Sequence, residues 1–424
     1  MTFAQLDSVL AEVEALGRLF VDGGYRLFLV GGIVRDQWLD QPLDASSDID
    51  LTTNALPGAI KELVADFADD MWTQGERFGT IGLRAVGRDL EITTHRAESY
   101  ASDSRKPTVS FGDDIAVDLS RRDFTVNAMA IELPHGDLVD PYNGAEDLKA
   151  GLLRTPLSAD ISFTDDPLRM LRAARFASRL DLSVADEIVD SASRLHERLR
   201  IVAIERIGVE MRRLLSLSDP RVGLEFLTTT GLLREVLSYG QPELGEPIQR
   251  RLTSAVALAK SLAADWQLRL AAIGVVVFDD EAGVHAMCQR LRLARDDERA
   301  ISRMSGEALA AIASSVDAPS LRRWEVAARE PERALVLAAA ITNDGDHIEA
   351  FSAQRRELLA VEDPNQQRYL SGDVIMAELG VLPGPAVGQA TAFLQESYFE
   401  NGPVTQDQQL EQLQRWWTDR ATNF

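Results

Sequence analysis

Two aspartates separated by one residue could hold a metal ion. Asp48 and Asp50 flank Ile49 in a short β-rich run, and because side chains alternate across a strand, both carboxylates would point to one face. Two negative charges held together are unfavourable unless a hard cation lies between them, and Mg²⁺ prefers such oxygen ligands. The alternative, the commoner case for an isolated Asp-x-Asp, is a strand edge with two solvated aspartates. Glu91, on another β-like run, could supply a third carboxylate, but alone it would be an exposed strand glutamate.

A glycine pair could bind an anion. Gly31 and Gly32 follow the apolar run 27–30 and precede Arg35. Free backbone N–H groups at the start of a helix favour a negative charge, and glycine lets a ligand approach the backbone closely. A tight strand-to-helix turn is the alternative explanation of the same pair.

Two cations, an acid and an amide lie together further along the chain. Arg121 and Arg122 are followed by Asp123 and Asn127, which lead into an apolar run. Arginine forks suit phosphate oxygens, and Asp and Asn can hydrogen-bond a ribose hydroxyl. The segment 140–144, Asp-Pro-Tyr-Asn-Gly, predicts a turn that closes this region.

A fourth segment places acids and arginines at helical spacing. Asp165, Arg169 and Arg172 recur at i, i+4 and i+7, with Asp166 beside the first, so on one helix they would share a face. A helix start, with an aspartate at the N-cap and Pro167 at the first position, explains the acids equally well, and both descriptions can hold together.

The elements that would position these residues change in kind near residue 150. Before it, short β-rich runs alternate with turn signals and predict a small mixed sheet with helices. After about residue 163, apolar residues recur at helical spacing and predict an all-helical remainder. The expected strands are 27–30, 49–51, 80–86, 90–93 and 128–133. The predicted fold class is α+β.

Composition narrows the function classes. The chain has 424 residues, 45% hydrophobic and 26% charged, with 44 Lys+Arg against 67 Asp+Glu and a net charge of −23. This argues for a globular protein of about two to four domains and against coating nucleic acid by bulk charge. The sequence has no apolar run of about 18 residues that would predict a membrane span, and its first thirty residues lack the pattern of a signal peptide. Cys288 is the single cysteine. We therefore expect a cytoplasmic protein.

One segment departs from the acidic average. Residues 169–213 contain ten arginines, no lysines and seven acids, a net charge of 10 − 7 = +3. A surface that tracks phosphates and a solvated helix face are equally consistent with this island.

Taken in order, the motifs resemble those of the class II tRNA nucleotidyltransferase and bacterial poly(A) polymerase family, over residues 27 to 215. The resemblance implies a polymerase-β-like nucleotidyltransferase head followed by an all-helical neck, body and tail. The expected divisions are the catalytic head 1–150, the nucleotide-selecting neck 151–240, the body 241–365 and a tRNA-contacting tail 366–424. The body would at most be a degenerate His-Asp (HD-type) region, because residues 268–280 lack histidine.

The resemblance also implies roles for individual residues. Asp48 and Asp50 would hold two Mg²⁺ ions for in-line phosphoryl transfer, with Glu91 as the third carboxylate. In the family, an acid-acid-x-x-Arg set reads the edge of the incoming base; the first acid is usually Glu and is here Asp165, so its role is left open. The expected nucleotide-binding residues are Gly31, Gly32, Arg35, Arg122, Asp123, Asn127, Asp165, Asp166, Arg169 and Arg172. Residues 204–207 with Glu210 resemble a further helical motif of the family, which implies that they brace the helix carrying Arg169.

The substrates implied are CTP, ATP and tRNA, with no membrane and no obligatory protein partner. The polar, breaker-rich segment 95–114 resembles a loop of members that add the final adenosine, and 77–81 resembles the tRNA-specific members, so full CCA addition is favoured. CC-adding, A-adding and poly(A)-forming enzymes are the alternatives within the family. A catalytically inactive RNA-binding relative is the alternative from another class.

Overall fold

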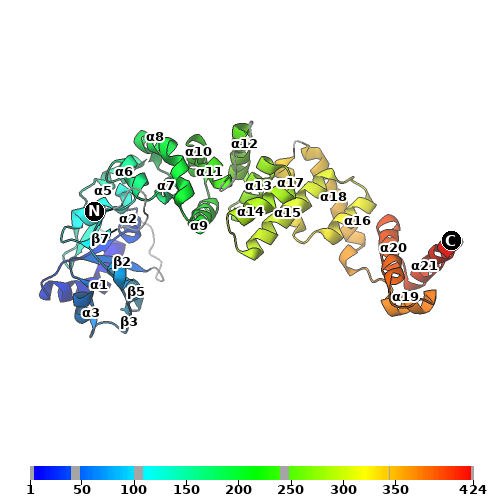
Figure 1. The fold of residues 1–424 in the computed structure, drawn as a ribbon, viewed down its shortest axis with the longest axis horizontal. Coiled ribbons are helices and arrows are strands. Elements are labelled where there is room, and N and C mark those ends of the chain that lie inside the picture. The colour runs from blue at the N-terminus through cyan, green and yellow to red at the C-terminus, as the bar shows by residue number, and fades with distance from the viewer. Residues whose placement is uncertain (1–3, 40–47, 100–107, 239–247, 343, 422–424) are drawn as a thin grey trace. The chain divides into compact units, whose positions relative to one another are not determined.

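The computed structural model describes residues 4–421 except 40–47, 100–107, 239–247 and 343. The chain forms two compact units, Met1–Leu244 and Gly245–Phe424 (Figure 1). The finer division into head, neck, body and tail stays a prediction.

The first unit is built on a seven-stranded sheet with the strand order β3-β4-β5-β2-β1-β8-β9. Strands β2 and β5 are parallel, whereas the other neighbouring pairs are antiparallel. The predicted mixed sheet is therefore confirmed. Its strands are β1 (Leu27–Val30), β2 (Ile49–Thr53), β3 (Asp70–Trp72), β4 (Thr80–Ala85), β5 (Arg88–Thr94), β8 (Ala130–Leu133) and β9 (Asp137–Val139). A separate hairpin joins β6 (Arg96–Ser99) to β7 (Thr108–Phe111).

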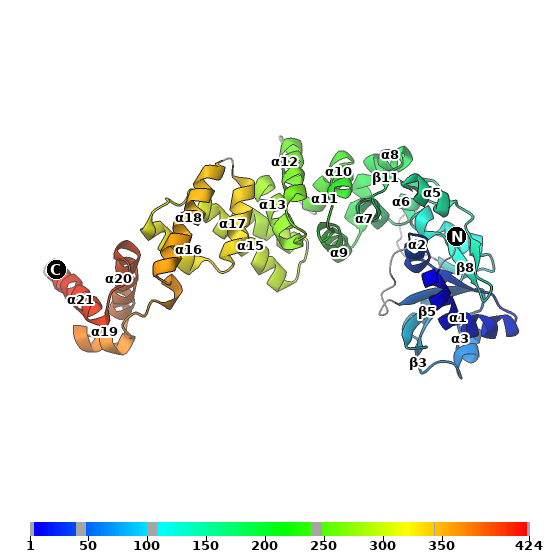
Figure 2. The same cartoon turned by 180° about the vertical axis from the view of Figure 1, so that it is seen from behind.

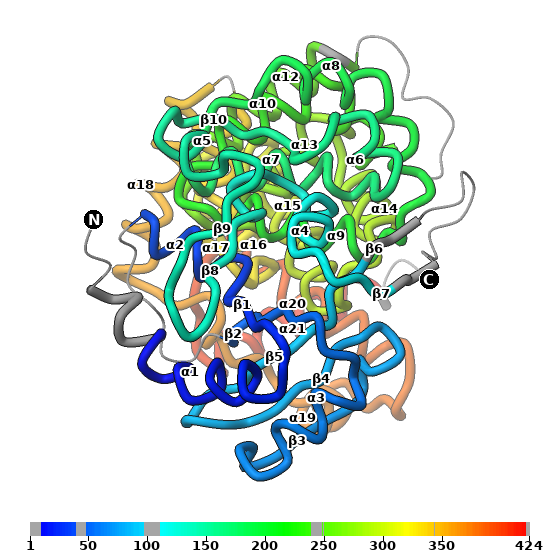
Figure 3. The backbone as a smooth tube through the Cα atoms, turned by 90° about the vertical axis from the view of Figure 1, so that its left-hand side faces the viewer, coloured from blue at the N-terminus to red at the C-terminus, as the bar shows by residue number. Residues whose placement is uncertain are grey.

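Both faces of the sheet are covered at β1, since the four residues of this strand are all buried and apolar. On one face, Phe28 and Val30 pack in a cluster with Ile115 and Leu119 of α4 (Ile115–Ser120). Helix α1 (Ala4–Asp22) contacts β1 and β8 (Figure 3). The sheet thereby fixes the ends of β1 and β2, where the candidate chemistry lies.

The rest of the first unit is mostly helical. Its helices are α5 (Gly144–Ala150), α6 (Ala159–Asp165), α7 (Leu168–Leu180), α8 (Asp186–Leu195), α9 (Ile204–Leu215), α10 (Arg221–Thr229) and α11 (Leu232–Leu237). The prediction of only helices beyond residue 163 is wrong at one place, since β11 (Ser183–Val184) pairs in parallel with β10 (Leu152–Leu153). A two-residue strand is too short to leave a period-two pattern in the sequence.

In its described residues the second unit is helical (Figure 2). Its helices are α12 (Ile248–Ser261), α13 (Trp266–Phe278), α14 (Glu281–Arg290), α15 (Arg295–Ala313), α16 (Ala318–Ala327), α17 (Pro331–Ile341), α18 (Gly345–Val361), α19 (Gly372–Leu379), α20 (Pro385–Asn401) and α21 (Gln406–Ala421). Helix α13 contacts α12, α14, α15 and α17. Cys288 is buried in α14, and burial raises the pKa of its thiol to about 12. No helix among the described residues is long and apolar enough to cross a membrane.

Candidate active site

The parallel pairing of β2 with β5 places two of the predicted carboxylates opposite each other. Asp50 is the register partner of Glu91, and Ile49 is the partner of Leu90. Ile49 and Leu90 are buried, whereas Asp48, Asp50 and Glu91 are exposed. The alternation expected for Asp-x-Asp is therefore present, with the carboxylates on the open side and the apolar residues in the core.

These carboxylates repel one another. Crowding by surrounding protein raises the pKa of Asp50 although its side chain reaches solvent, and the charge of Asp48 raises it further, against the opposing effect of Arg122. Partial desolvation raises the pKa of Glu91, and the charges of Asp50 and Asp48 add to this. A cation between the carboxylates would remove this repulsion.

The donor set fits Mg²⁺. Within the described residues, no three His, Cys, Asp or Glu side chains are grouped to hold a metal ion by themselves. Mg²⁺ usually takes one or two protein carboxylates and completes its octahedron with water and phosphate oxygens. Asp48 and Asp50 are two such hard oxygen donors on an open face.

The glycine turn lies against the same carboxylates. Gly31 precedes α2 (Gly32–Trp38) with φ 81, in the left-handed region where a side chain is strained. A Cβ on Gly31 would lie 3.3 Å from Asp50 Oδ2 and 3.6 Å from Arg122 Nη1. The turn, a candidate metal ligand and an arginine therefore converge on one place.

Arg122 has one donor without a partner among the described residues. In the described part of the chain, its buried Nε–H has no hydrogen-bond partner. Its Nη2 lies 3.5 Å from Asp118 Oδ2, which is an ion-pair contact rather than a hydrogen bond. A cation beside Gly31 with a buried, unused donor can receive an anionic ligand.

Asp118 is a buried carboxylate at the site that the sequence motifs do not single out. Its side chain is fully buried, and Oδ1 accepts from the backbone N–H of Arg96 at 3.2 Å and from Arg121 Nε at 3.1 Å and Nη2 at 3.0 Å. Burial alone would raise the pKa of Asp118, but the charges of Arg121 and Arg122 and these hydrogen bonds hold it below its usual value. The signal was present, because an acid three and four residues before two arginines predicts contact within a helix or its last turn.

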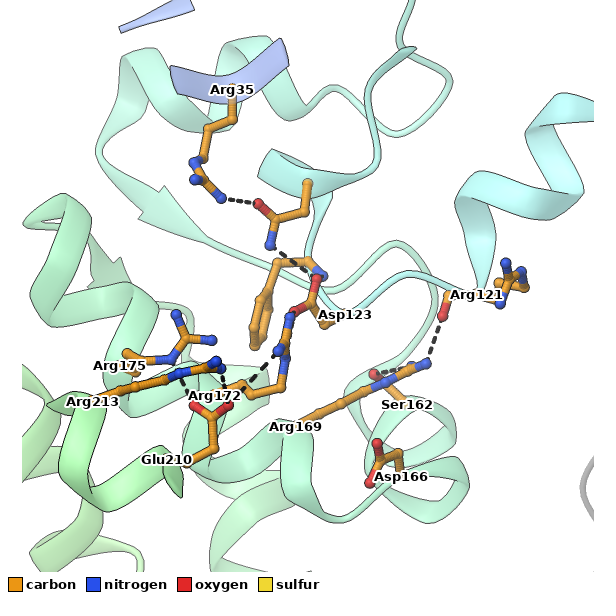
Figure 4. A network of polar contacts seen from close by, with 12 residues as sticks. Arg35, Arg121, Asp123, Ser162, Asp166, Arg169, Arg172, Arg175, Glu210 and Arg213 are labelled. Atoms are coloured by element: carbon orange, nitrogen blue, oxygen red, sulfur yellow. Dashed lines mark hydrogen bonds and ion pairs between the residues drawn. The ribbon is translucent and has the colours of Figure 1, made fainter. Parts of the chain in front are cut away.

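The residues predicted to contact sugar and phosphate form a network inside the protein (Figure 4). Asp123 is buried; its Oδ1 accepts from Asn127 Nδ2 at 2.9 Å and its Oδ2 accepts from Arg172 Nε at 2.8 Å. Arg35 is 2% exposed, donates to Asn127 Oδ1 and pairs with Asp36. Burial lowers the pKa of Arg35, although the charge of Asp36 opposes this. The structure thus brings these residues together, and their direct contact with a nucleotide stays a prediction.

The expectation that Asp165, Arg169 and Arg172 share one face of a single helix is wrong. Helix α6 ends at Asp165 and α7 begins at Leu168, because Pro167 disfavours helical backbone at Asp166, which is extended. Asp166 Oδ1 accepts from the N–H of Leu168 at 3.1 Å, so the helix-start explanation holds for Asp166, with the helix assigned one residue later than predicted. Asp166 Oδ2 also accepts from Arg206 at 3.1 Å.

Asp165 and Arg169 nevertheless lie at one pocket, on either side of this helix break. Both line a pocket of about 120 Å³, together with Arg121 and Arg122 of the preceding loop. Arg169 Nη1 donates to Ser162 Oγ at 2.9 Å, and its Nη2 donates to the carbonyl of Arg121 (Figure 4). The guanidinium is therefore fixed at the wall of a pocket that adjoins Arg122.

Arg172 points elsewhere. Besides Asp123 it lies 3.8 Å from Glu210, which is buried in α9 and accepts from Arg175 Nε at 2.6 Å. Arg213 also lies 3.5 Å from Glu210. Glu210 therefore neutralises arginines of the net-positive segment, and it fastens α9 to α7.

Two family profiles match the first unit. Residues 27–154 match the "Poly A polymerase head domain", and residues 181–245 match the "Probable RNA and SrmB-binding site of polymerase A". The matched head contains the sheet, the glycine turn and the carboxylates. The chain is a nucleotidyltransferase with a head of the poly(A) polymerase type.

Relatives identify the family more closely. The CCA-adding enzyme of Lactiplantibacillus plantarum is 30% identical over 97% of this chain and 97% of that protein. The CCA-adding enzyme of Lactobacillus helveticus is 38% identical, over 57% of this chain and 59% of that protein. The chain therefore belongs to the class II CCA-adding enzyme family.

Solved structures agree on the fold. The Bacillus stearothermophilus CCA-adding enzyme in complex with CTP matches with a TM-score of 0.71 and 24% identity, over 98% of this chain and 99% of that one. The Thermotoga maritima CCA-adding enzyme complexed with tRNA matches with a TM-score of 0.67 and 19% identity, over 96% and 95% of the two chains.

Proposed function

We propose that this protein adds C, C and A to the 3′ end of tRNA, using CTP and ATP. The convergence of Asp50, Glu91, Gly31 and Arg122 beside the Arg169 pocket supports this most directly, because it joins candidate metal ligands, an anion-receiving turn and a shaped recess. The relatives support tRNA as the substrate, because a protein that aligns with this chain over nearly its whole length is a CCA-adding enzyme. The site of action would be the cytoplasm, with no obligatory protein partner.

Each group has a task in in-line phosphoryl transfer. Asp48 and Asp50 would hold two Mg²⁺ ions, which supply activation of the RNA 3′ hydroxyl and neutralise charge on the triphosphate. Gly31 and Arg122 receive phosphate oxygens, because the turn carries no side chain and Arg122 Nε–H is unused within the described chain. Glu91 adds negative charge beside Asp50 and strengthens the field that draws in the cations.

The residues that line the pocket of about 120 Å³ would select the incoming base. Arg169 is fixed by two hydrogen bonds, from Nη1 to Ser162 and from Nη2 to the carbonyl of Arg121, and a fixed guanidinium discriminates hydrogen-bonding patterns on a base edge. Asp165 lies in the same wall, whereas Asp166 is engaged by Arg206 and by the start of α7.

The test uses tRNA transcripts that end before CCA, after C, or after CC. The protein is incubated with Mg²⁺ and CTP, ATP or both, and the products are read at nucleotide resolution. We expect growth to the completed CCA end, with C before A, and then arrest. Addition of only CC, or of only A, would assign the protein to one half of a divided pathway, and long adenosine tails would favour the poly(A) alternative. Tight tRNA binding without incorporation would favour the inactive RNA-binding relative.

A further inference from the structure

Asp118 is a fully buried carboxylate beside the proposed nucleotide site. Its side chain has no exposed surface, and it lies one turn before Arg121 and Arg122 at the end of α4. A buried carboxylate is retained at a cost unless it is paired and hydrogen-bonded. Its surroundings therefore indicate what it does.

The two oxygens of Asp118 are used differently. Oδ1 accepts from three donors, the backbone N–H of Arg96 and two guanidinium nitrogens of Arg121. Oδ2 has no hydrogen bond within the described residues, and Arg122 Nη2 lies 3.5 Å from it. Arg121 therefore satisfies the carboxylate, whereas Arg122 is held by charge at a longer distance.

Because of this asymmetry, Arg122 is oriented by Asp118 and still has hydrogen-bonding capacity for a ligand. One end of its guanidinium faces Asp118, and Nη1 lies 3.6 Å from the Cβ position of Gly31, next to Asp50 Oδ2. Without a negative charge behind it, Arg122 would be drawn towards Asp50, whose charge it already faces. Asp118 opposes that movement from the buried side.

We propose that Asp118 is a positioning residue that holds Arg122 for the triphosphate of the incoming nucleotide. This inference rests on the proposed function and deepens it. Asp118 touches no substrate and acts through Arg122. Because the triphosphate is common to both substrates, the loss of Asp118 weakens CTP and ATP equally.

The test compares D118N with D114N. Asn preserves the shape of Asp118 and removes its charge. Asp114 is the exposed N-cap residue of the same helix, and its Oδ1 accepts from the N–H of Ala116 at 2.8 Å. We expect D118N to raise the KM for CTP and for ATP by about tenfold each, with kcat changed by less than about threefold, since the substitution removes a charge 3.5 Å from Arg122 and breaks a partly buried ion pair. D114N should keep the wild-type KM values.

The double variant D118N/R122Q separates positioning from general structural damage. If Asp118 acts through Arg122, D118N adds little to the KM of R122Q. A D118N effect of the same size in both backgrounds, an unchanged KM in D118N, or a changed ratio of CTP to ATP use overturns the proposal. R122Q alone supplies a measurement that does not depend on the folding of D118N, because a wild-type KM in R122Q also overturns it.

Calorimetric binding of inorganic tripolyphosphate with Mg²⁺ separates this inference from the proposed function. A wild-type protein that binds tripolyphosphate about tenfold more tightly than D118N does, but adds no nucleotide to tRNA, would contradict the proposed function and support the role of Asp118. Equal binding by the two proteins would contradict the role of Asp118, whatever the activity on tRNA.

Discussion

Arg172 donates from Nε to Asp123 Oδ2 at 2.8 Å and thereby joins helix α7 to the loop that carries Asn127. The carboxylate of Asp123 is nearly closed to solvent, with 9% of its side chain exposed, whereas Arg172 keeps 31% of its side chain exposed. Burial would raise the pKa of Asp123, but Arg172 and Asn127 hold it below its usual value. The helical segment after the sheet is therefore locked to the proposed nucleotide site by a charge pair rather than by apolar packing alone.

Removing Arg172 should destabilise the first unit. Arg172→Ala leaves the carboxylate of Asp123 buried with Asn127 and a backbone N–H as its remaining hydrogen-bond donors. Breaking a buried pair in this way costs about 3 kcal/mol, which urea unfolding followed by circular dichroism would measure. Arg179→Ala on the same helix is the control, since Arg179 pairs with Asp36 with 40% of its side chain exposed and should cost less than about 1 kcal/mol. Equal losses in the two variants would show that the burial of Asp123 has no special cost.

The acidic pair makes a sharper prediction about activity. Asp48→Asn with Asp50→Asn should abolish nucleotide incorporation and leave the affinity for tRNA unchanged, because the change removes charge on the open side of the sheet and no core contact. Removing the repulsion between the two carboxylates should also leave the free energy of unfolding unchanged or raise it. The extension assay measures incorporation, a filter-binding assay measures the affinity for tRNA, and urea unfolding measures the stability. Incorporation above a few per cent of the wild-type rate would remove Asp48 and Asp50 from the metal site.

The sheet and the carboxylate pair could be predicted because their signals are local. Ile49 between Asp48 and Asp50 is a period-two pattern, and the run 27–30 before Gly31 is an apolar strand that ends at a turn. Such patterns survive in the fold because burial of alternate residues is what forms the strand. The register that places Asp50 opposite Glu91 is a long-range property, and no sequence spacing encodes it.

The helical part was predicted less well because spacing does not show breaks. The i, i+4, i+7 pattern of Asp165, Arg169 and Arg172 assumed an unbroken helix, and Pro167 divides it. The ion-pair partners of the arginines could not be predicted from the sequence either. Arg172 pairs with Asp123, 49 residues away, and Arg175 pairs with Glu210, 35 residues away. Several arginines of the net-positive segment 169–213 are therefore paired within the protein, and their number overstates the charge offered to RNA.

Arg169 should control which base is added. Arg169→Ala should lower CTP and ATP incorporation by about a hundredfold and raise the relative use of UTP and GTP, because a hydrogen-bonding site that loses its donor loses discrimination. Ser162→Ala removes one of the two hydrogen bonds that fix Arg169 and should show the same changes at a smaller size. Competition among the four nucleoside triphosphates on a tRNA that ends before CCA gives the ratios. Unaltered ratios in Arg169→Ala would place base selection elsewhere.

His95 gives the chain a pH-dependent stability. Its side chain is buried, with Nδ1 2.9 Å from Oγ1 of Thr52 in β2 and the ring centroid 5.6 Å from that of Phe28. Because Thr52 Oγ1 donates to the carbonyl of Thr93, we assign the donor in the contact to His95 Nδ1–H. His95 therefore donates from Nδ1 to Thr52 in the folded protein.

Desolvation lowers the pKa of His95 in the folded state, although the charge of Asp118 opposes this. The unfolded chain therefore binds the proton more tightly, and the stability contributed by neutral His95 is complete above about pH 6.5. It is lost as the pH falls from there to the lower pKa of the folded state, by at most about 1.4 kcal/mol per pH unit. Urea unfolding between pH 8 and pH 5.5 should show this loss in the wild type. His95→Asn, whose amide can donate to Thr52, should remove it, and His135→Asn at an exposed turn should not. Parallel curves for wild type and His95→Asn would mean that water reaches the ring and that the buried neutral imidazole is not what stabilises this side of the sheet.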